Sequence, residues 1–339
     1  MIVQIWNELK HKNFKPIYVF YGKETFLLSE TVRLMQEHAI PEEERDFNFS
    51  MFDMEETEID TAVEDAETLP FMGEKRVVVI KNPYFLSTEK KKEKVEHHLE
   101  RFERYIEEPS PFTILALIAP YEKLDERKKI TKLLKKKANV VEMNELSESE
   151  TIAWMNELAR QEDVLIEQSA IDQLFALTSG NLMIISSEMK KLCTYVGKGN
   201  TITEEDVKKL VARTLEQNIF ELIDYVIQKK KEKALELFYH LLKMNEEPIK
   251  ILNLMASQFR LLYQVKQLGA SGYTQPQIAS ILKVHPYRVK LANKQAKMFQ
   301  DHELTSIIQQ LAEADFEMKA GKMDKQLVLE LLLMRRFQT

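Results

Sequence analysis

The sequence predicts an α/β domain followed by an all-α region. Over residues 1–142, short apolar runs alternate with stretches of helical periodicity, the pattern of βαβ units around a parallel sheet. After Val141, helical periodicity continues without further apolar strand signals. The 339 residues include only 8 glycines and 10 prolines. So few turn-forming residues favour helices over tight hairpins.

Five candidate strands and three candidate helices make up the α/β domain. The strands are expected at residues 17–21, 48–52, 76–80, 113–119 and 139–142, and the helices at 58–67, 90–105 and 126–137. The runs 77–80 and 114–118 are continuously apolar, as expected for strands covered on both faces of a mostly parallel sheet.

The helical signals after the sheet fall into two groups. Helix starts are marked by capping-box pairs, Ser147 with Glu150 and Thr203 with Asp206. The first group is expected at 151–162, 168–178, 182–195 and 204–213, and the second at 220–229, 231–244, 248–268, 275–283, 286–299, 303–320 and 324–337. We therefore predict three domains, 1–142, 143–213 and 214–339, of which the last two are a small helical module and a helical bundle.

Composition and charge exclude several classes of protein. The single cysteine, Cys193, rules out an internal disulfide framework and suits a reducing compartment. No apolar run is long enough to span a bilayer, and the amphipathic first ten residues do not resemble a signal peptide. We expect a cytoplasmic protein without membrane contact. The net charge of −6 divides into +5 for residues 211–339 and −11 for the rest, whereas a protein that coats DNA alone is usually basic throughout.

The turn after the first predicted strand has the layout of a phosphate-binding loop but lacks two of its chemical elements. Gly22, Lys23, Glu24 and Thr25 lie between that strand and a helical run. A P-loop binds phosphate with backbone N–H groups, needs a glycine five residues before its Gly-Lys pair, and needs Ser or Thr after it for Mg²⁺. Ile17 and Glu24 occupy those two positions. These residues therefore indicate a degenerate nucleotide site.

Other catalytic signals are also missing. The strand that ends before Lys81 lacks the metal-binding carboxylate of an NTPase. The histidines stand at no metal-ligand spacing, and His97 with His98 is expected to be a solvated surface pair on a helix. We expect no catalytic residue, no metal and no cofactor. An active P-loop-type ATPase that depends on Lys23 stays open as an alternative.

The segment between the acidic helix 58–67 and the strand 76–80 contains apolar residues where a connection is expected to cross the surface. Leu69, Phe71 and Met72 flank or follow Pro70, and we call these four residues the apolar tip. A stiff proline between bulky side chains would present a preorganised wedge to a pocket on a partner. Alternatively, the side chains fold back over the edge of the sheet, which composition alone favours.

Basic residues gather in a segment that resembles a helix-turn-helix. Its two helices would be 275–282 and 286–299, with Lys283, Arg288, Lys290 and Lys294 as candidate DNA or phosphate contacts. The absence of a turn glycine and the position within a long bundle disfavour recognition of the major groove. A sequence-specific DNA-binding protein that uses residues 275–299 nevertheless stays open as a second alternative.

Short motifs spread along the chain resemble one known family in their order. They are YVFYGKETFL from Tyr18, LDERKK from Leu124, NIFELID from Asn218, QFRLL from Gln258 with Lys266, KQA from Lys294, and the closing segment 324–333. In this order they resemble the δ subunits of the bacterial DNA polymerase III clamp loader, over nearly the whole chain.

The resemblance implies an AAA+-like domain, a helical lid and a C-terminal helical collar. It further implies a subunit that does not hydrolyse ATP, a non-catalytic member of a DNA-directed DNA polymerase holoenzyme. In such proteins the first domain grips the β sliding clamp through an exposed hydrophobic tip and favours its open form, and the tip corresponds here to Leu69, Pro70, Phe71 and Met72. The collar would join the τ/γ and δ′ subunits, and the assembly would hold primer-template DNA.

Overall fold

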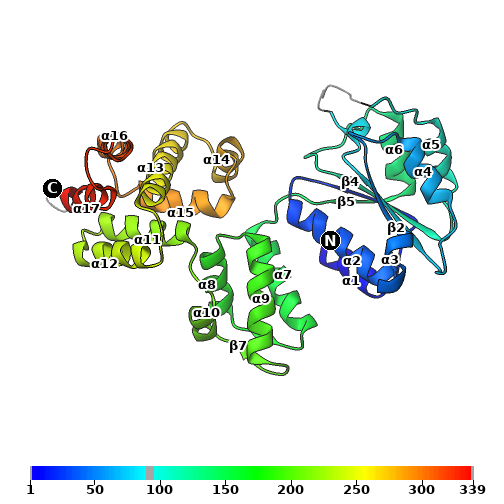
Figure 1. Cartoon of the computed structure of the whole chain (residues 1–339), viewed down its shortest axis with the longest axis horizontal. Helices are drawn as coiled ribbons and strands as arrows, with labels where there is room; N and C mark the ends of the chain where they lie inside the picture. Colours follow the sequence, from blue (N-terminus) through cyan, green and yellow to red (C-terminus); the bar gives the residue numbers. More distant parts are fainter. Residues whose placement is uncertain (1, 89–94, 337–339) are drawn as a thin grey trace. The chain divides into compact units, whose positions relative to one another are not determined.

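The computed structural model describes residues 2–88 and 95–336 and forms two compact units, residues 1–150 and residues 151–339 (Figure 1). Residues 90–94 of the predicted helix 90–105, and residue 337 of the last predicted helix, lie outside the described residues. The division of the second unit at residue 213 stays a prediction.

The first unit is built on a five-stranded parallel sheet in the order β2-β3-β4-β1-β5. Its strands are β1 (Ile17–Tyr21), β2 (Phe49–Asp53), β3 (Arg76–Lys81), β4 (Thr113–Ala119) and β5 (Asn139–Glu142). In β1, Val19 pairs with Leu117 of β4 and with Val140 of β5. All five predicted strands are present, each within one residue of its predicted bounds.

Helices cover both faces of the sheet (Figure 1). One layer contains α1 (Ile2–Lys10) and α2 (Thr25–Ala39), and the other contains α4 (Ile59–Glu67), α5 (Glu100–Glu107) and α6 (Lys129–Lys137). Ile17 and Val19 of β1 belong to one apolar cluster with Val63 of α4 and Phe102 of α5. The indole N–H of the buried Trp6 donates to the Thr31 hydroxyl over 2.7 Å and so ties α1 to α2.

The described residues of the first unit also form three short helices, and one predicted strand and one predicted helix begin later than expected. The short ones are η1 (Glu42–Glu44), α3 (Arg45–Asn48) and η2 (Tyr84–Leu86). Asn48, predicted to begin a strand, ends α3 instead. The predicted helix 126–137 begins only at Lys129, because Asp125 accepts hydrogen bonds from the backbone and side chain of Arg127 and holds a turn there.

The prediction for His97 was wrong. Residues 95–99 are not helical, and α5 begins at Glu100. The His97 ring lies 4.9 Å from the Tyr84 ring and 5.4 Å from the Phe85 ring. Its Nδ1 accepts from the Ile59 N–H over 3.2 Å, and its Nε2 lies 3.0 Å from the Met54 carbonyl. His97 therefore packs the connection before α5 onto the domain instead of facing solvent.

The second unit begins with a helical module that also contains two short strands. Its helices are α7 (Glu148–Gln161), α8 (Gln168–Thr178), α9 (Leu182–Val196) and α10 (Glu204–Leu210). Both predicted capping boxes are present, Ser147 with Glu150 and Thr203 with Asp206. The sequence pattern did not predict the two short strands β6 (Leu165–Ile166) and β7 (Thr201–Ile202), which pair in parallel. Strands of two residues are too short to show a periodicity in sequence.

After α10, the described residues of the second unit form seven helices. They are α11 (Leu215–Ile227), α12 (Lys231–Lys243), α13 (Pro248–Ala270), α14 (Gln275–Leu282), α15 (Pro286–Ala296), α16 (Asp301–Lys319) and α17 (Lys325–Arg336). The long helix α13 contacts α11, α14, α15, α16 and α17. Its buried Leu252, Phe259 and Leu262 form the centre of one apolar core. The second unit thus contains the predicted helical bundle.

Candidate functional site

The turn after β1 uses its own backbone donors. Four backbone N–H groups of this turn and of the start of α2 have an acceptor within the chain. These bonds run from the N–H of Gly22 to the Ala119 carbonyl (3.1 Å), of Lys23 to Asn144 Oδ1 (3.1 Å), of Glu24 to the Met143 carbonyl (3.0 Å) and of Phe26 to Glu24 Oε1 (3.1 Å). A phosphate would have to displace several of these bonds, and a displaced buried acceptor costs about 1–3 kcal/mol.

Glu24 occupies the place where a phosphate would sit at the N-terminus of α2. It is the N-cap residue, and its carboxylate accepts from the Phe26 N–H. Burial raises the pKa of this carboxyl, and the nearby Glu145 raises it further. Lys23 is exposed, with its Nζ 3.7 Å from the exposed carboxylate of Glu122. Thr25 is exposed at the first position of α2. The helix N-terminus therefore carries an internal anion.

The metal-binding part of a nucleotide site is likewise not assembled. Beside the turn, β3 ends in Lys81, and the Asn82 amide donates to Asp53 Oδ2 over 2.8 Å. Throughout residues 2–88 and 95–336, no group of three or more His, Cys, Asp or Glu side chains is placed to hold a metal ion.

The apolar tip is exposed on the loop between α4 and β3. The exposed fractions of Leu69, Phe71 and Met72 are 70%, 54% and 84%, and Pro70 is half-buried. These side chains do not fold back over the edge of the sheet, which was the alternative that composition favoured. Burial of such side chains against a partner contributes about 1.5–3 kcal/mol each.

Buried polar side chains fix the backbone of this loop. Asn48 of α3 is fully buried, and its amide donates to the Phe71 carbonyl (2.9 Å) and accepts from the Phe71 N–H (2.7 Å). Arg76 of β3 pairs with Asp65 of α4 at 2.6 Å, and its second guanidinium nitrogen lies 3.5 Å from the Leu69 carbonyl. The tip is therefore a held loop rather than a free one.

Local backbone geometry shapes the end of the same loop. Met72 has a φ of 53°, in the left-handed region that costs a side-chain-bearing residue about 1–3 kcal/mol. A β-carbon on Gly73 would lie 2.1 Å from Glu44 Oε2 and 3.0 Å from Asn48 Nδ2. The missing side chain allows the loop to lie directly against η1 and α3.

Phe47, which no sequence pattern indicated as a site residue, lies beside the apolar tip. Its side chain is 58% exposed, and its ring centre lies 5.1 Å from that of Phe71. Phe47 and Phe71 are 24 positions apart in the chain, so no local pattern predicts the contact. The only available signal was an aromatic residue next to a run of acidic ones.

The four basic residues predicted as phosphate contacts have different surroundings. Lys283 is exposed and adopts a φ of 53° in the turn between α14 and α15, a conformation usually left to glycine. Lys290 and Lys294 are exposed one turn apart on α15, and Lys290 Nζ lies 5.9 Å from the centre of the Tyr287 ring. Arg288 is half-buried and lies 3.6 Å from Glu216.

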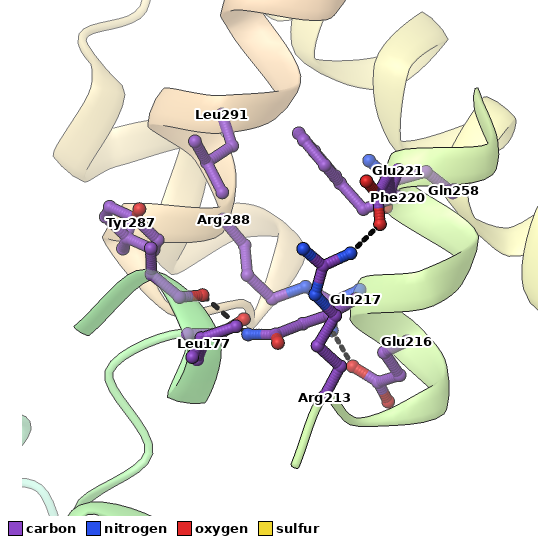
Figure 2. A pocket seen from close by; sticks show the side chains of 12 residues that line it. Leu177, Arg213, Glu216, Gln217, Phe220, Glu221, Gln258, Tyr287, Arg288 and Leu291 are labelled. Atoms are coloured by element: carbon purple, nitrogen blue, oxygen red, sulfur yellow. Dashed lines mark hydrogen bonds and ion pairs between the residues drawn. The ribbon is translucent and has the colours of Figure 1, made fainter. Parts of the chain in front are cut away.

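Arg288 lines a pocket of about 240 Å³ inside the second unit, together with residues of α8, α11, α13 and α15 (Figure 2). Figure 2 shows a second arginine there, Arg213, paired with Glu221. The Gln217 amide donates to the Ala176 carbonyl of α8 over 2.5 Å. Because each arginine has a carboxylate partner, the pocket does not concentrate positive charge. Arg288 is half-buried and paired with Glu216. Lys283, Lys290 and Lys294, in contrast, are exposed to solvent.

Comparison with protein-family models gives three matches along the chain. The model described as "DNA polymerase III, delta subunit" matches residues 18–144, and that for the C-terminal domain of the same subunit matches residues 216–336. A model described as a middle domain matches residues 147–209. The fold defines an α/β protein in which a five-stranded parallel-sheet domain is followed by helical modules.

Full-length relatives identify the family within that class. The chain is 53% identical over 335 residues to the DNA polymerase III subunit delta of Bacillus subtilis, covering 99% of this chain and 96% of the relative. It is 24% identical over 260 residues to a probable delta subunit of Aquifex aeolicus, covering 76% and 72%. The solved structure of the Bacillus subtilis DNA clamp loader delta protein is 52% identical, covers 100% of both chains and gives a TM-score of 0.89. The chain belongs to the family of DNA polymerase III delta subunits.

Family membership confirms the predicted fold class and the predicted role as a clamp-loader subunit, and it does not favour the two alternatives. The part of the chain that the structure describes contains no helix long and apolar enough to cross a membrane.

Proposed function

We propose that this chain binds the β sliding clamp through the apolar tip. The observation that carries the proposal is the exposure of Leu69, Phe71 and Met72 on a loop whose backbone is held by Asn48 and Arg76. Rigid exposed apolar residues lose little conformational entropy on binding, so more of their burial energy contributes to affinity. Such residues are typical centres of protein interfaces.

In this proposal, binding alone favours the open form of the clamp. A clamp ring is closed by interfaces that open and close, and a protein that binds the open form more tightly shifts the population toward it. The equilibrium constant between closed and open clamp shifts by the ratio of the two affinities. Binding alone can therefore favour the open clamp, and this chain does not need to hydrolyse ATP. With the backbone donors of Gly22, Lys23 and Glu24 engaged internally, energy from ATP would come from other subunits, and this chain needs no cofactor.

The remaining contacts belong to the assembly. In this proposal residues 214–339 join the τ/γ and δ′ subunits, and the complex acts in the cytoplasm on primer-template DNA. The exposed Lys283, Lys290 and Lys294 would contribute contacts to phosphates, which position DNA without selecting a sequence.

A binding measurement with matched variants tests the proposal. The full-length chain is titrated against the sliding clamp of its own source by surface plasmon resonance. The double variant Leu69→Ala/Phe71→Ala should lose at least about 100-fold in affinity, because two anchors worth about 1.5–3 kcal/mol each are removed. The control is Leu165→Ala/Phe316→Ala, whose side chains are 70% and 61% exposed in the second unit. Equal affinity of the two variants would refute the assignment of the tip.

A further inference from the structure

The apolar tip is supported by a second segment, the four-residue helix α3 (Arg45–Asn48), which lies more than 20 positions earlier in the chain. Asn48 is its last residue and is fully buried. Its side-chain amide forms two hydrogen bonds, of 2.9 and 2.7 Å, with the carbonyl and the N–H of Phe71. One edge of an asparagine amide presents an N–H donor beside a carbonyl acceptor, so it can pair with the N–H and C=O of one backbone residue as a neighbouring strand would. Asn48 thereby fixes the conformation of Phe71.

Phe47 precedes Asn48 and faces the other way. Its side chain is 58% exposed, and its ring centre lies 5.1 Å from that of Phe71 at an interplanar angle of 43°. The two rings, with Leu69 and Met72, form one group of exposed apolar side chains from two segments. A half-exposed aromatic ring leaves much of its burial free energy unused in the fold, and that energy is available to an interface.

We propose that α3 is the second half of the clamp-binding element, with Phe47 as a contact residue and Asn48 as the residue that positions the tip. This inference rests on the proposed function, and the partner is the same: α3 and the tip would bind one apolar pocket of the sliding clamp. Phe47 would enlarge the apolar surface inserted into that pocket. Asn48 would hold Phe71 in its bound conformation beforehand, which reduces the ordering cost of binding.

Residues around the tip support its backbone and leave its apolar side chains exposed, as expected for a contact surface. Gly73 has no side chain where a β-carbon would lie 2.1 Å from Glu44 Oε2 and 3.0 Å from Asn48 Nδ2, so the loop returns directly against η1 and α3. Arg76, which pairs with Asp65, lies 3.5 Å from the Leu69 carbonyl. Asn48 and Arg76 thus contact the backbone of the tip while its apolar side chains stay exposed.

Phe47→Ala in the full-length chain is the primary test, because the residue is exposed and its truncation should not prevent folding. We expect clamp affinity to fall about tenfold, equivalent to about 1.4 kcal/mol. The matched control Phe316→Ala removes a 61% exposed phenylalanine of the second unit and should leave affinity unchanged. A loss below about twofold for Phe47→Ala would overturn the role of Phe47, since its ring would then merely shield Phe71.

Asn48→Ala tests the positioning role with a second observable. Without its partner, the Phe71 amide should exchange its hydrogen with solvent faster, and clamp affinity should fall with it. A purely structural role would instead lower the stability of the first unit with no change in affinity for the fraction that is folded. Faster exchange at Phe71 with unchanged affinity would overturn the positioning role.

The outcomes separate this inference from the function on which it rests. If Leu69→Ala/Phe71→Ala abolishes binding and Phe47→Ala and Asn48→Ala do not, the tip binds the clamp without α3. If Leu69→Ala/Phe71→Ala itself binds normally, the proposed function fails. If all three variants lose affinity and the Phe316→Ala control does not, both proposals stand.

Discussion

The Met143 carbonyl oxygen lies 2.1 Å from the point where a β-carbon of Gly22 would stand. The same carbonyl accepts the Glu24 N–H over 3.0 Å. The segment after β5 thus lies directly on the turn after β1 and takes one of the donors that a phosphate would need. The missing side chain of Gly22 therefore allows the turn after β1 and the segment after β5 to approach this closely.

Gly22→Ala should destabilise the first unit by more than about 3 kcal/mol, since its φ of 149° is nearly restricted to glycine and the new methyl meets backbone atoms. Unfolding in urea is followed by Trp6 fluorescence in a Trp154→Phe background, which leaves one tryptophan in the chain. As a control, Gly199→Ala has a φ of 78° but no atom within 4 Å and should cost only about 1 kcal/mol, measured by Trp154 fluorescence in a Trp6→Phe background. Equal costs at the two sites would contradict the close approach.

MgATP should not stabilise the isolated chain. A ligand that binds the folded state raises its stability in proportion to the logarithm of concentration over Kd, and the donors of the turn are already engaged. The melting temperature should stay constant up to millimolar MgATP, with the same result for Lys23→Ala. A rise that Lys23→Ala abolishes would restore the nucleotide site.

Glu24→Gln should change how stability depends on pH. The pKa of Glu24 in the folded chain is raised above its ordinary value of 4.5, mainly by burial. The folded state therefore binds this proton more tightly than the unfolded state, and the contribution of Glu24 to stability decreases as pH rises from 4.5 through the raised pKa. Glutamine keeps an acceptor for the Phe26 N–H without the charge.

The stability gained by Glu24→Gln relative to the unsubstituted chain should consequently be larger at pH 7 than at pH 4. Urea titrations at the two pH values, followed by Trp6 fluorescence, measure this difference. An identical effect of the substitution at both values would argue against a raised pKa.

Arg76→Met should destabilise the first unit by about 3 kcal/mol, because the carboxylate of Asp65 loses its cationic partner in a mostly buried site and keeps the Ser50 hydroxyl as a donor. The Arg76 and Asp65 side chains are 8% and 23% exposed. Arg101→Met is the matched control: it removes two ion pairs to α4 at more exposed positions, Glu64 and Glu67, and should cost less than about 1 kcal/mol. Urea denaturation of both variants measures the loss of unfolding free energy. Equal losses would contradict the view that burial makes the Arg76–Asp65 pair more important for stability.

Local sequence was sufficient for the sheet and most helices, but not for contacts between distant segments. β1 and β4 have the predicted bounds because continuous apolar runs specify strands buried on both faces. The capping box of Thr203 and Asp206 was predictable because both partners lie within one helical turn.

The contacts that shape the candidate site lie beyond such patterns. Asn48 was predicted to begin a strand, yet its function in the fold is to hold Phe71, 23 positions later. His97 was predicted to be solvated, and it packs between distant groups instead. Exposure of the tip side chains was expected only from the family resemblance, because composition favoured their packing over the sheet edge. The support from α3 depends on tertiary packing that no local period encodes.

The most direct test of the central claim is the affinity of the full-length chain for its sliding clamp with and without the tip side chains. We predict nanomolar to micromolar binding by the unsubstituted chain, a loss of at least about 100-fold in Leu69→Ala/Phe71→Ala, and no loss in Leu165→Ala/Phe316→Ala. Undiminished binding by Leu69→Ala/Phe71→Ala, with both variants equally stable to urea, would contradict the account.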